Sequence, residues 1–158
     1  TAGIWTINLS NPALPTHVGT FDTPGYAENV ALDATGTLAF VADRVGGLRV
    51  VSLANLNAPT AVGSLAPAGR TYRDVAIAGS LAYLVNQGGS LDVVNVGTPS
   101  APQLVTWTLL NSSAFRVAVS GTLAAVYVTP SATVDALAIV PAKNHQCVAG
   151  RVVGEGHA

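Results

Sequence analysis

A four-residue motif recurs three times along this chain at a nearly constant spacing, and this repeat constrains the fold more than any other feature. The motif reads GTLA from Gly36, GSLA from Gly79 and GTLA from Gly121, with spacings of 43 and 42 residues. A short apolar run precedes each copy. Self-similarity at a fixed period is the signature of architectures in which each repeat is one supersecondary unit. We therefore expect a stack of similar units.

A second motif keeps the same register. Its three clear copies are residues 3–9, 47–53 and 90–96, and a weaker fourth copy is residues 134–139. A proline follows each of the first three copies, at Pro15, Pro59 and Pro102, with spacings of 44 and 43 residues. Several landmarks that share one period indicate a true repeat rather than a chance similarity.

Each repeat contains four strand-like runs. In the central copy they are residues 72–78, 81–86, 91–96 and 102–110, separated by Gly, Asn, Ser and Pro. The runs are almost continuously apolar, which is typical of a sheet covered on both faces. Sustained helical periodicity is absent, so we expect little helix. Four strands in about 43 residues are typical of one β-propeller blade. The sequence predicts an all-β chain that forms a partial β-propeller of four-stranded antiparallel blades.

The composition excludes several classes of protein. Only 9% of residues are charged and 49% are hydrophobic, the reverse of a disordered chain. Seven basic residues spread along the chain provide no patch for nucleic acid, so no nucleic-acid partner is expected. The most apolar stretch, residues 122–140, contains Pro130, Ser131 and Asp135, so no transmembrane segment is expected. Blades stacked on both faces would account for so little charge.

Several stretches of the repeat resemble a known family. They are residues 10–15, 22–27 leading into 30–32, 38–43 leading into 46–48, and 47–53 followed by 62–64. These stretches are similar to the LVIVD-repeat family of bacterial and archaeal propeller proteins, over about residues 3–140. The resemblance implies a propeller fold and an exported or cell-surface location. It implies no activity, cofactor or catalytic residue.

The repeat register divides the chain into parts. We expect a partial propeller over residues 1–140 and a non-repeat tail or cap over residues 141–158. Within the propeller we expect an incomplete blade (1–28), two blades (29–71 and 72–113) and a partial blade (114–140). Closed propellers typically have about 4–8 blades, so we expect a fragment of a larger propeller whose remaining blades are partners. Exposed blade faces should make the isolated piece associate or fold poorly.

The candidate binding residues lie in loops that a propeller gathers on one face, namely those between the fourth and first strands and between the second and third. They are Tyr26, Glu28, Asn29, Asp43, Arg44, Arg70, Tyr72, Arg73, Asp74, Asn86, Gln87 and Arg116. The alternative interpretation is that these are ordinary solvated loops, because charge belongs in loops when strands are buried. Arg73 and Asp74 are expected to pair with each other or with adjacent blades. Trp5 and Trp107 are expected in the core.

Metal and catalytic sites find little support in the sequence. His145, Cys147, Glu155 and His157 are residue types that suit zinc, but their spacing matches no recognised metal motif. His145 and Cys147 could form a nucleophilic pair by type, but no third group orients them. We therefore expect no metal, no cofactor and no catalytic residue.

Two functions from different classes remain open. The first is a noncatalytic repeat module of an exported or cell-surface protein that binds a protein or glycan partner through loops on one face. The second is a regulatory or substrate-positioning propeller domain of a larger enzyme. A self-contained propeller hydrolase would need convergent acid and base residues, and the carboxylates are too few to nominate a pair.

Overall fold

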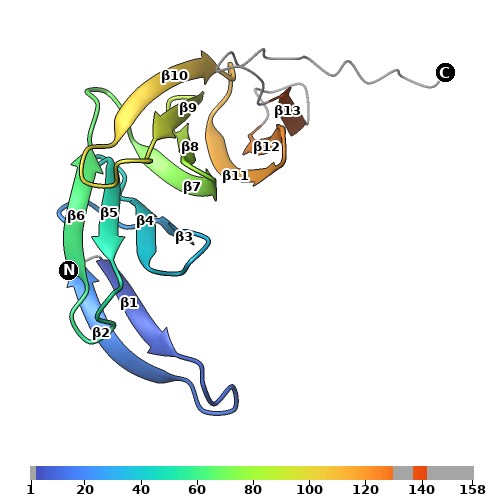
Figure 1. Cartoon of the computed structure of the whole chain (residues 1–158). Helices are drawn as coiled ribbons and strands as arrows, with labels where there is room; N and C mark the ends of the chain where they lie inside the picture. The colour runs from blue at the N-terminus through green and yellow to red at the C-terminus, as the bar shows by residue number, and fades with distance from the viewer. Residues whose placement is uncertain (1–2, 130–136, 142–158) are drawn as a thin grey trace.

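The computed structural model describes residues 3–129 and 137–141, and in these ranges all regular structure is β-strand. The strands form four antiparallel sheets that follow one another along an open arc (Figure 1). In the described part of the chain, no helix is long and apolar enough to cross a membrane. The all-β prediction is confirmed.

Two sheets are complete four-stranded meanders. The first contains β3 (Asn29–Leu32), β4 (Leu38–Ala42), β5 (Leu48–Ser52) and β6 (Thr60–Leu65), in that order. The second contains β7 (Tyr72–Ala78), β8 (Leu81–Asn86), β9 (Ser90–Asn95) and β10 (Gln103–Leu109). The strand bounds predicted for the central repeat agree with the structure to within one residue at each end.

The other two sheets are partial, one before the complete pair and one after it. The first joins β1 (Gly3–Asn8) to β2 (Thr16–Asp22), and the last joins β11 (Ala114–Ser120), β12 (Leu123–Val128) and β13 (Leu137–Pro141). By repeat register, β1 and β2 are third and fourth strands, and β11 to β13 are first to third strands. First strands lie toward the concave side of the arc, and β6 and β10 lie on its outer rim (Figure 1). The chain is a partial β-propeller whose sheets do not close into a ring.

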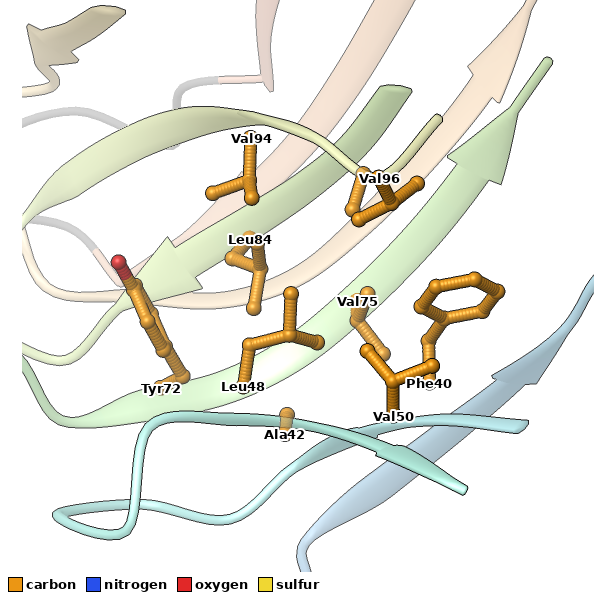
Figure 2. Packing of buried hydrophobic residues seen from close by; sticks show 10 residues of the cluster. Phe40, Ala42, Leu48, Val50, Tyr72, Val75, Leu84, Val94 and Val96 are labelled. Carbon is orange, nitrogen blue, oxygen red and sulfur yellow. The ribbon is translucent and has the colours of Figure 1, made fainter. Parts of the chain in front are cut away.

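Side chains of the inner strands alternate between two neighbouring sheets. Because successive residues of a strand point to opposite faces, Val41 and Val51 face the β1–β2 sheet, where they meet Ile4. Phe40 and Val50 face the next sheet along the chain. One buried cluster therefore spans two blades; it consists of Phe40, Ala42, Leu48, Val50, Tyr72, Val75, Ala82, Leu84, Val94 and Val96 (Figure 2). Each fully buried Leu or Val contributes about 1.5–3 kcal/mol.

The outer strands are less covered, and the prediction for the two tryptophans is wrong. Along β10, exposed and half-buried residues alternate, so that Trp107 is 48% exposed. Trp5 is 71% exposed because the β1–β2 sheet is packed on one face only, and Trp5 points away from that face. Its indole makes an edge contact with His17, at 5.0 Å between ring centroids.

The recurring motif that revealed the repeat begins with a turn glycine. Gly79 has a φ of 58° and Gly121 a φ of 57°, in the left-handed region that residues with a Cβ adopt at a cost. Both glycines stand between the first and second strands of their blades. The motif therefore records a tight hairpin followed by the first apolar residues of a buried strand.

Candidate functional site

The candidate loops gather at one end of the blades. Strand register shows this directly, since the start of each first strand pairs with the end of the second: Asn29 with Ala42, Tyr72 with Asn86, and Ala114 with Val128. Third strands begin at this end, and fourth strands finish there. We call this end the loop end.

Glu28 joins two blades through two arginines at the loop end. It lies just before β3, and its side chain is 19% exposed. Nε of Arg44, which follows β4, donates a hydrogen bond to Oε2 of Glu28 at 2.8 Å. Nη1 of Arg73, in β7 of the next blade, donates one to Oε1 at 3.1 Å. The hydrogen bond and the charge of Glu28 raise the pKa of Arg44.

Arg73 and Phe115 occupy β-bulges at equivalent positions of successive blades. The ladder between β7 and β8 skips one residue at Arg73, and the ladder between β11 and β12 skips one at Phe115. A bulge leaves one residue unpaired and redirects its side chain. The Arg73 guanidinium carbon lies 4.7 Å from the Phe115 ring centroid. By repeat alignment Glu28 holds the same position in the preceding blade, so equivalent residues of three blades contact one another in series.

Two exposed tyrosines extend this series. The Arg44 guanidinium carbon lies 5.0 Å from the centroid of the Tyr26 ring, which is 59% exposed. At the other end, Phe115 and Tyr127 have ring centroids 6.2 Å apart, and Tyr127 is 57% exposed. A cation over an aromatic face is attracted by the ring quadrupole, by about 0.5–1 kcal/mol at exposed sites.

A second cluster surrounds the buried carboxylate of Asp92. Oδ2 accepts hydrogen bonds from the Tyr72 hydroxyl at 2.8 Å and lies 2.9 Å from Nε of Arg70, and Oδ1 accepts one from Ser90 at 2.8 Å. Burial, together with the charge of Asp92, raises the pKa of the Tyr72 hydroxyl. Arg70 also lies over the Trp107 ring, at 5.0 Å from its centroid. The carboxylate is satisfied internally and is not accessible.

Asp43 has a similar structural role in the preceding blade. Its carboxylate is fully buried and accepts hydrogen bonds from the Thr23 hydroxyl at 2.6 Å and from the Gly25 N–H at 2.8 Å. Arg49 lies 3.6 Å away and provides the opposite charge. Buried charges are tolerated only when they are paired and hydrogen-bonded, and Asp43 and Asp92 both meet that condition.

Asp74 ties its blade to the next one. Its Oδ1 accepts from the backbone N–H of Val75 at 2.9 Å, and its Oδ2 accepts from that of Val117, in β11, at 2.8 Å. Burial raises the pKa of this carboxyl, although both backbone hydrogen bonds oppose the shift. The sequence left open whether Arg73 and Asp74 pair with each other or with adjacent blades. In the structure, each binds an adjacent blade.

The predicted binding residues fall into two groups. Four are buried and bonded within the protein: Asp43, Tyr72, Asp74 and Asn86. The others reach the surface at least in part: Tyr26, Glu28, Asn29, Arg44, Arg70, Arg73, Gln87 and Arg116. Reasoning from sequence did not select Asp92, Trp107 and Tyr127. Asp92 could have been selected, because it aligns with Arg49 in the repeat and a charged residue in a buried strand requires a partner.

Metal binding and acid–base catalysis receive no positive support from the described residues. Within residues 3–129 and 137–141, no three His, Cys, Asp or Glu side chains gather as a metal site. The residues considered for zinc, His145, Cys147, Glu155 and His157, lie outside the described ranges. A hollow at the opposite end of the blades is lined by Asn95, Thr98, Ala101 and Gln103, none of which is ionisable.

Comparisons with known proteins agree with the repeat. The family model of the LVIVD repeat matches residues 24–66 and 69–107, which together are about half of the chain. A comparison with curated proteins found no match. Among solved structures, the crystal structure of the computationally designed Ika8 protein is similar, with a TM-score of 0.65 at 10% identity. The likeness covers 83% of this chain and 38% of Ika8, so the chain spans well under half the length of that protein. At this identity the likeness shows the fold alone.

Proposed function

The chain belongs to the LVIVD-repeat family, and from this premise we propose that it is a noncatalytic propeller module that binds a protein or glycan partner through the loop end. The family resemblance further supports an exported or cell-surface protein as its context. Blades provide a rigid scaffold, and loops on a rigid scaffold are where binding residues concentrate.

One observation supports this proposal above the others. At the loop end, arginines and aromatic rings from three blades are joined through Glu28 into a continuous series of contacts, and the outer members of that series are exposed. Tyr and Arg are enriched where proteins recognise partners, because they offer large contact areas together with hydrogen-bond donors. At the same end the carboxylates of Asp43, Asp74 and Asp92 are buried, and that of Glu28 is held by two arginines. The accessible groups are therefore suited to recognition rather than to proton transfer.

Binding to panels of immobilised glycans and cell-surface proteins tests the proposal. We expect the chain to bind at least one partner, and the variant Tyr26→Ala at the loop end to weaken that binding. The variant Asn11→Ala provides the control, because Asn11 lies in the turn between β1 and β2 at the opposite end of the blades. Chemical conversion of the bound partner by the chain, or an equal loss of binding in the two variants, would contradict the proposal.

A further inference from the structure

Six side chains form an unbroken series across three blades, which we call the arginine–aromatic band. In order of contact they are Tyr26, Arg44, Glu28, Arg73, Phe115 and Tyr127. Arg44 and Arg73 are anchored by the Glu28 carboxylate, and Arg73 and Phe115 are positioned by their bulges. The band is therefore held in place before any partner arrives, and a preformed surface costs less ordering entropy on binding.

Exposure divides the band into a fixed centre and accessible ends. The side chains of Glu28 and Arg73 are 19% and 16% exposed, whereas that of Arg44 is 40% exposed. Arg44 uses Nε for its bond to Glu28, and among the described residues no hydrogen-bond acceptor occupies its terminal nitrogens. With Tyr26 beside it and Tyr127 at the far end, the accessible groups are one guanidinium and two aromatic rings.

The band and its surroundings carry an excess of positive charge. The cations here are Arg44, Arg73 and Arg116, and the anions are Glu28 and Asp74. Arg44 and Arg73 both pair with Glu28, and the Asp74 carboxylate is buried against backbone N–H groups. The whole chain has a formal net charge of −1, so this positive excess is local. Arg116 is exposed beside Phe115 and adds a second accessible guanidinium. A surface of this charge complements an anionic partner.

Resting on the proposed function, we infer that the arginine–aromatic band binds an acidic polysaccharide, a chain of sugars that carry carboxylate groups. A pyranose ring presents a flat C–H face that stacks on a tyrosine ring. Its carboxylate fits the planar fork of a guanidinium, which favours bidentate bonds to carboxylates. An extended chain can reach both ends of a band that spans three blades. A peptide of acidic residues alone, such as poly-L-glutamate, would engage the guanidiniums but has no ring face for the two tyrosines.

Calorimetric titration of the 158-residue chain with oligogalacturonate tests the inference. We expect binding that weakens as salt is raised, since exposed charges are screened, and little binding of the methyl-esterified oligomer, which lacks the charge. Arg44→Gln and Tyr127→Ala should each weaken binding by about tenfold or more, the scale of one lost charged hydrogen bond or stacking contact. Arg44→Lys should recover only part of the lost affinity, because lysine keeps the positive charge but lacks the planar fork of the guanidinium.

Trp5→Ala is the matched control, because Trp5 is an exposed aromatic residue on a sheet that contributes nothing to the band. It should bind as the unmodified chain does. Thermal unfolding of every variant shows whether weaker binding arises from loss of the fold, and Tyr127→Ala, at an exposed end, provides a test that does not disturb the Glu28 pairs.

Four outcomes would overturn the inference. They are equal binding of the esterified oligomer, no effect of the Arg44 and Tyr127 variants, an equal effect of Trp5→Ala, and tighter binding of poly-L-glutamate. The last outcome would indicate an acidic protein as the partner. If a neutral glycan binds the loop end instead, the inference fails while the proposed function stands; if nothing binds there, both fail.

Discussion

Single residues of the loop end have two distinct roles, which the sequence could not separate. Sequence position placed Tyr26 and Tyr72 in the same set of loops, yet one ring is 59% exposed and the other is fully buried. The difference arises because the Tyr72 ring packs into the cluster between blades and its hydroxyl meets a carboxylate two strands away. The packing of the ring depends on how neighbouring blades stack, which one sequence alone does not specify.

Arg70 is predicted to stabilise the fold through its pairing with Asp92. In the variant Arg70→Gln, the fully buried carboxylate keeps two hydroxyl donors and loses its counter-charge. Breaking a buried ion pair costs about 3–5 kcal/mol, and we expect a loss of that order in the free energy of unfolding, measured by denaturant titration. Arg116→Gln, on the surface, should change it by about 0.5 kcal/mol or less.

A companion variant separates charge from shape at this position. Arg70→Gln with Asp92→Asn removes both charges, and it should recover part of the lost stability because no buried charge is left unpaired. A loss below about 1 kcal/mol in Arg70→Gln alone would show that solvent or the hydroxyl groups compensate for the missing charge.

Asp74 is predicted to make stability fall as pH rises. Burial raises its pKa in the folded state above the ordinary value of 3.8, so the unfolded chain releases this proton first. Its contribution is therefore fully present below about pH 3.8 and declines as pH rises through the raised folded value. In denaturant titrations across this window, the stability of the unmodified chain should fall relative to that of Asp74→Asn.

Asp33 provides a control of opposite sign. The hydrogen bond from the Thr35 hydroxyl, with the backbone N–H of Leu38, lowers the pKa of Asp33. Its contribution is therefore present above the ordinary value and is lost as pH falls. Relative to Asp33→Asn, the unmodified chain should gain stability as pH rises. The difference in unfolding free energy between the unmodified chain and each variant is plotted against pH. Slopes of the same sign for Asp74→Asn and Asp33→Asn would contradict the assignment of these two environments.

At the scale of elements, the strands were largely predictable and their exposure was not. Strand bounds follow from local chemistry, since apolar runs between turn residues are visible in the chain itself. The structure confirms that the middle strands of the two complete blades are covered on both faces, as β8 shows with five buried residues of six. The fourth strands are equally apolar at some positions but lie on the outer rim, so Trp107 and Leu109 are about half exposed. Position within the blade decides this, and local sequence does not report it.

Gly63 in β6 marks a close approach between neighbouring blades. A Cβ at this position would overlap the carbonyl oxygen of Pro99, in the turn of the next blade. Gly63→Ala should therefore force the backbones apart and cost about 1–3 kcal/mol, measured as a loss in the free energy of unfolding. Ser64→Ala, in the same strand but exposed, should have little effect. Equal stability of both variants would show that the blades adjust without strain.

At the scale of the whole molecule, one sheet face is apolar and uncovered. Trp5 and Ile7 share the outer face of β1, where they are 71% and 43% exposed, and Leu9 follows at 64%. Clustered exposed apolar residues commonly drive association. We expect concentration-dependent self-association of the 158-residue chain in sedimentation velocity, and Trp5→Lys with Ile7→Lys should reduce it. Val45→Lys is the control, since Val45 is exposed in a loop at the other end of the sheets.

A chain that remains monomeric at all concentrations would contradict this prediction.

The period and strand count were enough to predict the partial propeller, because each blade contacts mainly its neighbours and the architecture is a sum of similar units. The candidate site was predictable only as a set of loops. Which loop residues meet depends on the displacement between blades, and the contact between Glu28 and Arg73 bridges 45 positions of sequence.

The recurring bulge of the first strands has a consequence for how such proteins can diversify. At equivalent repeat positions, successive blades carry glutamate, arginine and phenylalanine, and the bulge is the same around the last two, Arg73 and Phe115. A substitution there changes the chemistry presented between two blades without altering the hydrogen-bond ladder that defines either of them. Duplicated blades would thus supply several independently variable positions, and a new specificity could arise by exchanging one residue at a time on an unchanged scaffold.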